Sequence, residues 1–187
     1  DLTNLQRQIA HHEADIGIAK AISSLNTLKS LNSEVIVHAH PVKLMGQELQ
    51  EAVAAADVVL DCSDNFSTRF AINSACVATG KALVSGAAIR FEGQISVFIP
   101  SDNDSPCYNC LYQMEGEELQ NCARNGVIAP LTGIIGSMQA LEAMKVIMGI
   151  GDNLKGRLLL LDGLTMEWQT MRLKRNPHCP TCGKMQD

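Results

Sequence analysis

Apolar residues recur at helical spacing in three segments of the first 80 residues. The first spans residues 16–31, and Asp15 stands where it could cap a helix (the apolar positions are Ile18, Ile22, Leu25 and Leu28). The same period returns at residues 47–56 and at residues 67–79. We therefore expect three helices in this part of the chain.

Short apolar runs stand between and after these helical segments, at residues 35–37, 57–61 and 82–85. The run at 57–61 is continuous between two aspartates, which is typical of a strand buried on both faces of a parallel sheet. Three strands that alternate with helices predict an α/β fold with a mostly parallel sheet.

The second half of the chain has a different pattern. We expect a strand at residues 94–99, a polar turn at 102–106, and a surface loop or short helix at 115–125. A long apolar segment at 130–148 predicts a buried helix, with Met138, Met144 and Met148 as packing residues. Two final strands are expected at 157–162 and 166–172, joined by a turn at Gly163. No repeat or linker divides the sequence, so residues 1–187 are expected to form a single domain.

Composition narrows the class of protein. Hydrophobic residues make up 46% of the 187 residues and charged residues 19%, which is enough apolar material for a core. The net charge of −5, without a basic run, argues against a nucleic-acid binder, and no apolar stretch is long enough to span a membrane. Seven cysteines, an odd number, favour metal binding and free thiols in a reducing cytoplasm over a disulfide framework.

Four cysteines form two Cys-x-x-Cys pairs, Cys107 with Cys110 and Cys179 with Cys182. Four thiolates suit tetrahedral zinc, whereas a redox pair usually opens a helix in a thioredoxin-like unit. We expect one zinc ion that joins two distant parts of the chain. Four protein ligands leave no open position, so its role would be structural.

The segment 61–65 (Asp-Cys-Ser-Asp-Asn) follows the expected buried strand at 57–61, where ligands bind in open α/β sheets. Asp64 is a candidate for binding magnesium or acting on a phosphate. An equally simple interpretation is that Asp64 and Asn65 cap the next helix.

Other polar residues have both a functional and a structural interpretation. Arg7 and Asn4 stand three residues apart on one side of a turn, and the Arg7 fork could pair with phosphate oxygens. The alternative is a solvated surface, which is also the simplest interpretation of Lys20, His11 and His12. Among the remaining thiols, Cys122 beside Arg124 could be a nucleophile or an unreactive cysteine, and Cys62 and Cys76 are interpreted as core residues.

Together, these motifs resemble the MoeB/ThiF family, the bacterial relatives of ubiquitin-activating enzymes, over essentially the whole chain. The shared segments are Asn4-Leu5-Gln6-Arg7-Gln8, Lys20, Asp61-Cys62-Ser63-Asp64-Asn65, Ser85-Gly86-Ala87-Ala88-Ile89-Arg90, Glu92-Gly93-Gln94, both cysteine pairs and Gln139-Ala140-Leu141-Glu142-Ala143. The resemblance implies a Rossmann-like fold of the E1/ThiF type, with an antiparallel region near the C-terminus and a zinc site.

The resemblance also implies an activity. The family uses ATP to adenylate the C-terminal glycine of a ubiquitin-like sulfur carrier, which later becomes a thiocarboxylate. By resemblance, Thr3, Asn4, Leu5, Gln6 and Arg7 line the nucleotide site, with Asn4 and Arg7 as polar contacts. Lys20 would reach the phosphates, Asp64 would hold Mg²⁺, and Asn65 would lie beside the nucleotide, so that Asp64 and Arg7 are the expected catalytic residues. A homodimer and a sulfur-donor protein are the other implied partners.

Two branches of the family fit this sequence. The segment 85–90 and residues 1–12 are more similar to the members that act on a MoaD-type carrier in molybdopterin biosynthesis. Members that act on the ThiS carrier in thiamine biosynthesis are the alternative. Cys122 matches a cysteine that the thiamine enzymes bond to their carrier, but a cysteine also occurs there in the molybdopterin branch.

The chain departs from the family pattern at its start. The family begins with a strand, a Gly-rich turn of the form G-x-G-G-L-G and a helix, and the printed residues hold no such turn. We therefore expect an N-terminally truncated domain that binds ATP poorly by itself, because the turn supplies N–H groups for phosphate. A non-catalytic module that docks a ubiquitin-like protein is the competing function, and a nucleotide-dependent oxidoreductase, suggested only by the α/β alternation, is a third.

Overall fold

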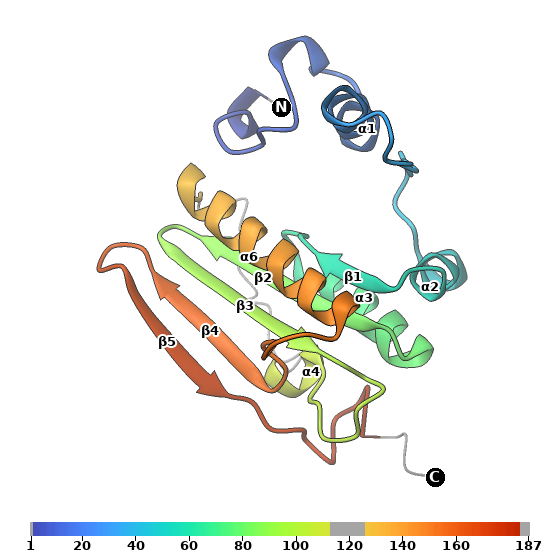
Figure 1. The fold of residues 1–187 in the computed structure, drawn as a ribbon, viewed down its shortest axis with the longest axis vertical. Coiled ribbons are helices and arrows are strands. Elements are labelled where there is room, and N and C mark those ends of the chain that lie inside the picture. Colours follow the sequence, from blue (N-terminus) through green and yellow to red (C-terminus); the bar gives the residue numbers. More distant parts are fainter. Residues whose placement is uncertain (1, 113–125, 184–187) are drawn as a thin grey trace. The chain divides into compact units, whose positions relative to one another are not determined.

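The computed structural model describes residues 2–112 and 126–183 of the chain (Figure 1). The chain divides into two compact units, Asp1–Leu44 and Met45–Asp187, and each is described by itself. No helix among the described residues is long and apolar enough to cross a membrane.

The first unit contains two short 3-10 helices, η1 (Leu2–Asn4) and η2 (Glu13–Asp15), and the helix α1 (Lys20–Leu31). Polar contacts organise it around the buried Ser23, whose hydroxyl donates to Asp15 Oδ2 at 2.8 Å and lies 2.7 Å from His11 Nδ1. The pKa of Asp15 is lowered because the backbone N–H of His12, and then Ser23, donate to its carboxylate.

Two predictions for this unit are wrong. The helix begins at Lys20 and not at residue 16, and the cap position is Ala19, because Asp15 instead accepts hydrogen bonds from His12 and Ser23. Residues 35–37 do not form a strand. Val35 and Ile36 are 51% and 82% exposed, and no strand lies beside them among the described residues, so their β-branched side chains have no sheet to join.

The second unit is built on a five-stranded sheet in the order β1-β2-β3-β4-β5. Its strands are β1 (Val58–Asp61), β2 (Ala82–Ile89), β3 (Glu92–Phe98), β4 (Arg157–Asp162) and β5 (Glu167–Arg172). Only β1 and β2 are parallel, and the other three neighbouring pairs among the described strands are antiparallel. The expected α/β class and the antiparallel C-terminal region are confirmed. The expectation of a mostly parallel sheet is wrong for the described strands, because β3, β4 and β5 follow β2 in an antiparallel meander.

Helices cover the two faces of this sheet separately. Successive side chains of a strand point to opposite faces. Leu83 of β2 packs with α3 (Phe66–Thr79) in one core cluster, whereas its neighbour Val84 packs with α6 (Ala129–Met148) in another. The helix α2 (Gly46–Ala54) packs on α3 and buries Val53 in the first cluster. Figure 1 shows α6 lying across its face of the sheet.

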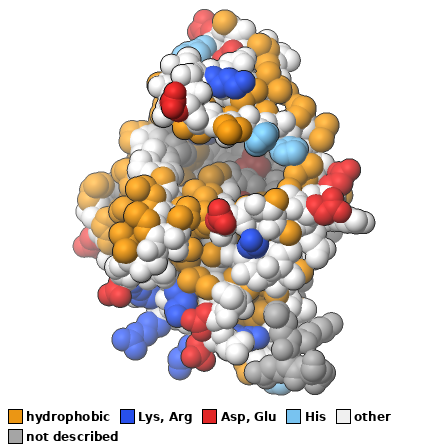
Figure 2. Space-filling view, turned by 45° about the vertical axis from the view of Figure 1, so that its right-hand side comes forward, with side chains coloured by type: hydrophobic (Ala, Val, Ile, Leu, Met, Phe, Trp, Pro, Cys, Tyr) orange, Lys and Arg blue, Asp and Glu red, His pale blue; other side chains and the backbone are white. Residues whose placement is uncertain are grey.

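The strand predicted at 57–61 exists, but only Asp61 of β1 is buried, and Leu60 is 40% exposed. The predicted long helix also exists, but only one side of α6 is buried. Met138 packs in the core as expected, whereas Met144 and Met148 are 54% and 52% exposed, so their assignment to the core is wrong. Figure 2 shows many hydrophobic side chains at the molecular surface. The predicted element at 115–125 lies outside the described residues.

Candidate functional site

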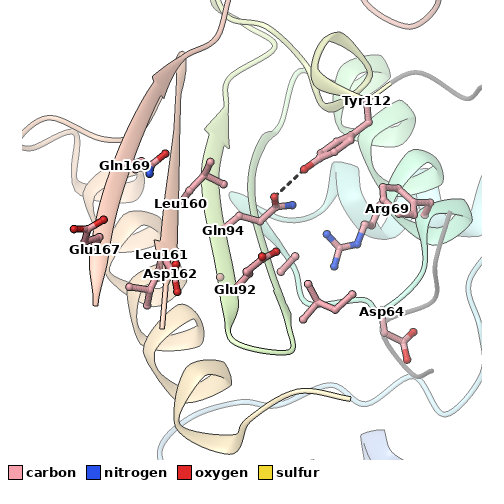
Figure 3. A pocket seen from close by; sticks show the side chains of 14 residues that line it. Asp64, Arg69, Glu92, Gln94, Tyr112, Leu160, Leu161, Asp162, Glu167 and Gln169 are labelled. Carbon is pink, nitrogen blue, oxygen red and sulfur yellow. Dashed lines mark hydrogen bonds between the residues drawn. The ribbon is translucent and has the colours of Figure 1, made fainter. Parts of the chain in front are cut away.

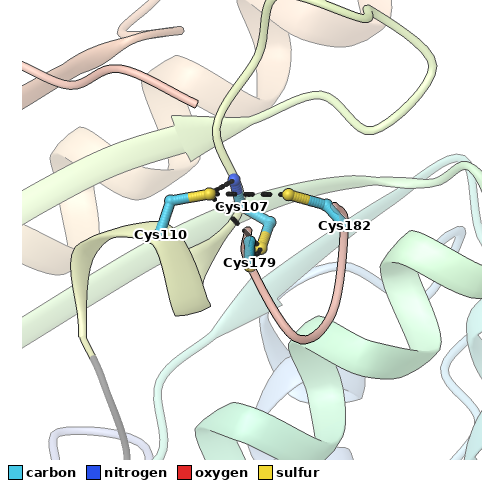
Figure 4. A group of neighbouring side chains, drawn as sticks. All are labelled: Cys107, Cys110, Cys179 and Cys182. Atoms are coloured by element: carbon cyan, nitrogen blue, oxygen red, sulfur yellow. Dashed lines mark hydrogen bonds between the residues drawn. The ribbon is translucent and has the colours of Figure 1, made fainter. Parts of the chain in front are cut away.

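The four predicted metal-ligand cysteines come together in the second unit (Figure 4). Their sulfur atoms all lie within 4.8 Å of one another, with Cys107 and Cys179 at 3.5 Å and Cys110 and Cys182 at 3.5 Å. Four sulfurs at about 2.3 Å from one zinc ion would lie about 3.8 Å apart in a tetrahedron. The donor set and its spacing therefore fit a metal ion such as zinc.

One cysteine of the cluster, Cys110, is biased towards the thiolate form that metals bind, whereas the hydrogen bond to Cys110 raises the pKa of Cys107 and burial raises that of Cys182. The pKa of Cys110 is lowered, first because the thiol of Cys107 donates to its sulfur, with further help from the backbone N–H groups of Asn176 and Cys107. Cys107 is the N-cap of the single turn α4 (Tyr108–Leu111), Cys110 lies within this turn, and Cys179 and Cys182 come from the C-terminal segment. The cluster thus joins segments 72 residues apart.

The loop after β1 is held by its own side chains. Asp61, 1% exposed, accepts hydrogen bonds at Oδ1 from the N–H and the hydroxyl of Ser63, at 2.9 and 2.6 Å. Asn65 caps α3 by accepting from the N–H of Thr68 at 2.9 Å. Asn65 therefore has the predicted capping role, and the exposed Asp64 beside it does not cap the helix.

Asp64 stands at one margin of a pocket of about 460 Å³ on the α3 face of the sheet (Figure 3). The floor comes from residues of the antiparallel strands, among them the cross-strand neighbours Gln94 and Leu160. Phe66, Arg69 and Tyr112 form the side near α3. This volume is in the range of ligand pockets, about 300–1,000 Å³.

Two polar groups are fixed in this pocket. The Tyr112 hydroxyl donates to Gln94 Oε1 at 2.8 Å. Arg69 is 5% exposed, and its Nη2 donates to the Ser63 carbonyl oxygen at 2.6 Å. Arg69 and Tyr112 were not predicted as site residues, and Gln94 was named only within the shared segment Glu92-Gly93-Gln94. The position of Arg69, one helical turn after the cap Asn65, was the available signal.

The predicted nucleotide contacts of the N-terminal segment belong to the first unit. Arg7 Nη2 donates to Asn4 Oδ1 at 2.6 Å, so the two side chains lie on one side of the turn, as expected. Arg7 Nη1 also donates to the Thr3 carbonyl oxygen at 3.4 Å. Leu5 and Gln6 lie in the same turn, and the exposed Lys20 begins α1. Thus Thr3 to Arg7 and Lys20 belong to one unit and Asp64 and Asn65 to the other.

The remaining cysteines differ in exposure. Cys76 is fully buried, as predicted, and burial raises its pKa to about 12. Cys62 is exposed, so its assignment to the core is wrong. The Cys62 sulfur lies 3.6 Å from Gln139 Oε1. Partial desolvation of this sulfur raises the pKa of the Cys62 thiol. Cys122 lies outside the described residues.

Residues 1–181 match the model of the ThiF family. The molybdopterin-synthase adenylyltransferase of Escherichia coli K12 is 43% identical over 183 residues, which cover 98% of this chain and 73% of that protein. The SAMP-activating enzyme E1 of Haloferax volcanii is 41% identical, with 97% of this chain and 67% of the enzyme covered. The adenylyltransferase and sulfurtransferase MOCS3 of Drosophila persimilis is 42% identical over 96% of this chain, which spans 40% of its length.

Solved structures give the same fold. E. coli MccB with ATP matches with a TM-score of 0.81 at 20% identity, over 98% of this chain and 57% of that chain. At this level of identity the likeness concerns the fold alone. The family match over nearly all residues and the three relatives above show that this chain belongs to the ThiF family.

Proposed function

We propose that this protein is an ATP-dependent adenylyltransferase that activates the C-terminal glycine of a ubiquitin-like sulfur carrier of the MoaD type, for molybdopterin biosynthesis. The observation that most supports this proposal is the 43% identity to the molybdopterin-synthase adenylyltransferase of E. coli over 98% of this chain. The substrates and partners are proposed for the whole protein, because the chain spans 40% to 73% of these relatives.

The reaction replaces a poor electrophile with a reactive one. A carboxylate oxygen of the carrier attacks the α-phosphorus of ATP, a new P–O bond forms, and the bond to pyrophosphate breaks. The products are acyl-adenylate and pyrophosphate. Catalysis requires alignment of the two anionic reactants and neutralisation of their charge.

We assign these tasks to the residues that the family resemblance implies. Asn4 and Arg7 would contact the nucleotide, with Thr3, Leu5 and Gln6 in the same turn, and Lys20 would reach its phosphates. The Asp64 carboxylate would hold Mg²⁺, which supplies charge neutralisation at the reacting phosphate, and Asn65 would lie beside the nucleotide. The exposed carboxylate of Asp64, after a buried strand end, is the kind of hard oxygen ligand that Mg²⁺ prefers.

The pocket next to Asp64 would hold the carrier's C-terminal tail. The tail must bring its carboxylate to the α-phosphate, and the pocket leads across the sheet from Gln169 on β5 to Asp64 (Figure 3). A tail that ends in glycine is narrow at its end, and an extended chain suits a groove floored by strands.

We further propose that the cysteine cluster holds zinc and that the protein acts as a homodimer in the cytoplasm. All six described cysteines are free thiols, which fits a reducing compartment. The exposed apolar side of α6, with Leu141, Met144 and Ile147, supports the dimer, because such faces mark contact sites.

An ATP–pyrophosphate exchange assay tests the activity. The chain is assayed alone and with a Gly-rich turn of the form G-x-G-G-L-G and its flanking strand and helix fused ahead of residue 1, with MoaD-type and ThiS-type carriers. We expect exchange by the fused protein with the MoaD-type carrier. Faster exchange with the ThiS-type carrier would move the function to thiamine biosynthesis, and binding of carriers without exchange would replace the enzyme by a docking module.

A further inference from the structure

Arg69 is a buried cation whose side chain faces the pocket. The residue is 5% exposed, yet it lines the pocket, and Figure 3 shows its guanidinium group directed between Gln94 and Asp64. The hydrogen bond from Nη2 to the Ser63 carbonyl oxygen at 2.6 Å fixes this orientation. A buried arginine is costly unless its donors are used, and a guanidinium has five of them in a planar fork.

The charges around the pocket give Arg69 a distinct position. Four carboxylates line the pocket, and among the described lining residues Arg69 is the one basic side chain (the acids are Asp64, Glu92, Asp162 and Glu167). Glu92 and Glu167 each lie directly across the ladder from Asp162, so three acids form a row over three strands. An anionic chain end is repelled by this row and is stable only beside the guanidinium.

Neighbouring groups respond to the same cation. Burial raises the pKa of Tyr112, and the positive charge of Arg69 opposes that rise. Tyr112 and Arg69 thus enclose the inner end of the pocket with one hydroxyl and one cation (Figure 3).

Resting on the proposed function, we propose that Arg69 binds the terminal carboxylate of the sulfur carrier and presents it beside Asp64 for adenylation. The guanidinium pairs with a carboxylate through two parallel hydrogen bonds, which fixes the direction of the attacking oxygen. It also cancels a negative charge that would otherwise repel the α-phosphate.

The stage of the reaction at which Arg69 acts follows from the charges. The carrier oxygen is anionic before attack and becomes part of an uncharged acyl linkage afterwards. The attraction to Arg69 is therefore strongest in the bound ground state and weakens as the new P–O bond forms. Loss of Arg69 should raise KM for the carrier more than it lowers kcat.

The experiment compares a MoaD-type carrier that ends in a free carboxylate with the same carrier prepared as a C-terminal carboxamide. Affinities for the 187-residue protein are measured by titration calorimetry without ATP. We expect the carboxylate form to bind about 10- to 100-fold more tightly, as hydrogen bonds between charged groups allow. In Arg69→Gln the ratio should fall to near one, in Arg69→Lys it should recover in part, and in Arg172→Gln, an arginine of β5 that does not line the pocket, it should stay at the wild-type value.

The carboxamide carrier also reports on folding. Its unchanged binding to Arg69→Gln would show that the pocket is intact. A wild-type ratio in Arg69→Gln, or an equal loss of both carriers in that variant, would overturn the role of Arg69 alone. Failure of the wild-type protein to bind either carrier would overturn the proposed function, and the inference with it.

Discussion

The side-chain amide of Gln139 occupies the space that a β-carbon on Gly86 would need. A β-carbon built on Gly86 would lie 2.4 Å from Gln139 Cδ. Gln139, 3% exposed, donates from Nε2 to the carbonyl oxygens of Asp61 and Val84, at 2.9 and 3.2 Å. One residue of α6 thereby joins the carboxyl end of β1, where the Asp64 loop begins, to β2.

Gly86→Ala should destabilise the protein by about 1–3 kcal/mol, the usual cost of overpacking. The added methyl group would displace Gln139 and break its bonds to β1 and β2. The measurement is urea unfolding followed by circular dichroism. Gly133→Ala is the control, because a β-carbon there meets nothing within 4 Å and alanine favours a helix, so its stability should stay equal or rise. Equal stability of the two variants would contradict the role assigned to Gly86.

Removal of the metal should loosen the fold before it affects chemistry. Cys179→Ser, or a chelator, would separate the C-terminal segment from α4 and leave buried thiols without the metal ion that they share. We expect a lower Tm in differential scanning calorimetry, restored by zinc for the chelated protein but not for the variant. Cys62→Ser, at an exposed thiol outside the cluster, should keep the wild-type Tm and zinc content. A chelator-insensitive Tm would show that the cluster holds no metal.

Asn73→Ala should cost about 2–3 kcal/mol of unfolding free energy, because it leaves buried groups without partners. Asn73 is 1% exposed, accepts from the N–H of Tyr108 at 2.9 Å and donates to Asn109 Oδ1 at 3.2 Å. These bonds tie α3 to α4. Ser74→Ala, at the next and exposed position, is the matched control and should change stability by less than about 0.5 kcal/mol. Similar costs in both variants would argue against the network.

The free energy of unfolding should fall in alkaline solution because the buried Cys76 thiol and Tyr108 phenol resist ionisation in the folded state. Burial raises the pKa of Cys76 from 9.0 to about 12 and that of Tyr108 from 10.0 to about 12. The unfolded chain ionises first, so this stability is complete below pH 9 and is lost as the pH rises towards 12. Tyr108→Phe should reduce the slope between pH 10 and 12 in urea titrations.

At neutral pH, Tyr108→Phe should be nearly neutral for stability. The buried Tyr108 hydroxyl makes no well-formed hydrogen bond among the described residues, and its neighbour Arg69 keeps its bond to the Ser63 carbonyl oxygen, so removal of the hydroxyl leaves no newly unsatisfied group. A slope between pH 10 and 12 that equals that of the wild type would show that Tyr108 does not control the alkaline transition.

Asp64→Asn should lower the exchange rate of the fused protein by about 100-fold or more, in line with the loss of one preorganised electrostatic group. The loss should be larger in kcat than in KM for the carrier, unlike that of Arg69→Gln. Asp57→Asn, at the other end of the same apolar run, is the control and should keep wild-type exchange. Intact exchange in Asp64→Asn would remove this residue from the mechanism.

Periodicity located most of the second unit. Helices α2, α3 and α6 and all five strands lie where the pattern predicted them, because each buries one face or stripe in a shared core. Residues 35–37 were misassigned because β-branched residues indicate a strand only where a neighbouring strand exists. Local spacing also could not show that β2 continues to Ile89, which depends on its long antiparallel pairing with β3.

The candidate site was predictable only in part. The two cysteine pairs predicted the cluster correctly, because the Cys-x-x-Cys spacing of metal ligands is visible locally within each pair. No spacing between ligands marked Arg69 in the same way. Its role depends on a pocket assembled from strands some 25 to 100 residues later in the chain, among them β3 and β5. The tertiary fold, and not the local motif, makes this arginine the one cation among the described lining residues.

The short helix α4 connects the cysteine cluster to the pocket. Cys107 caps this turn and Cys110 lies within it, while Tyr112, immediately after the turn, lines the pocket and donates a hydrogen bond to Gln94. A metal held by the cysteines would therefore set the position of a residue that touches the substrate. Under the proposed function, a shortage of zinc would lower the activity of each copy of the protein even at constant abundance, so that trace-metal nutrition would govern the supply of activated sulfur carrier.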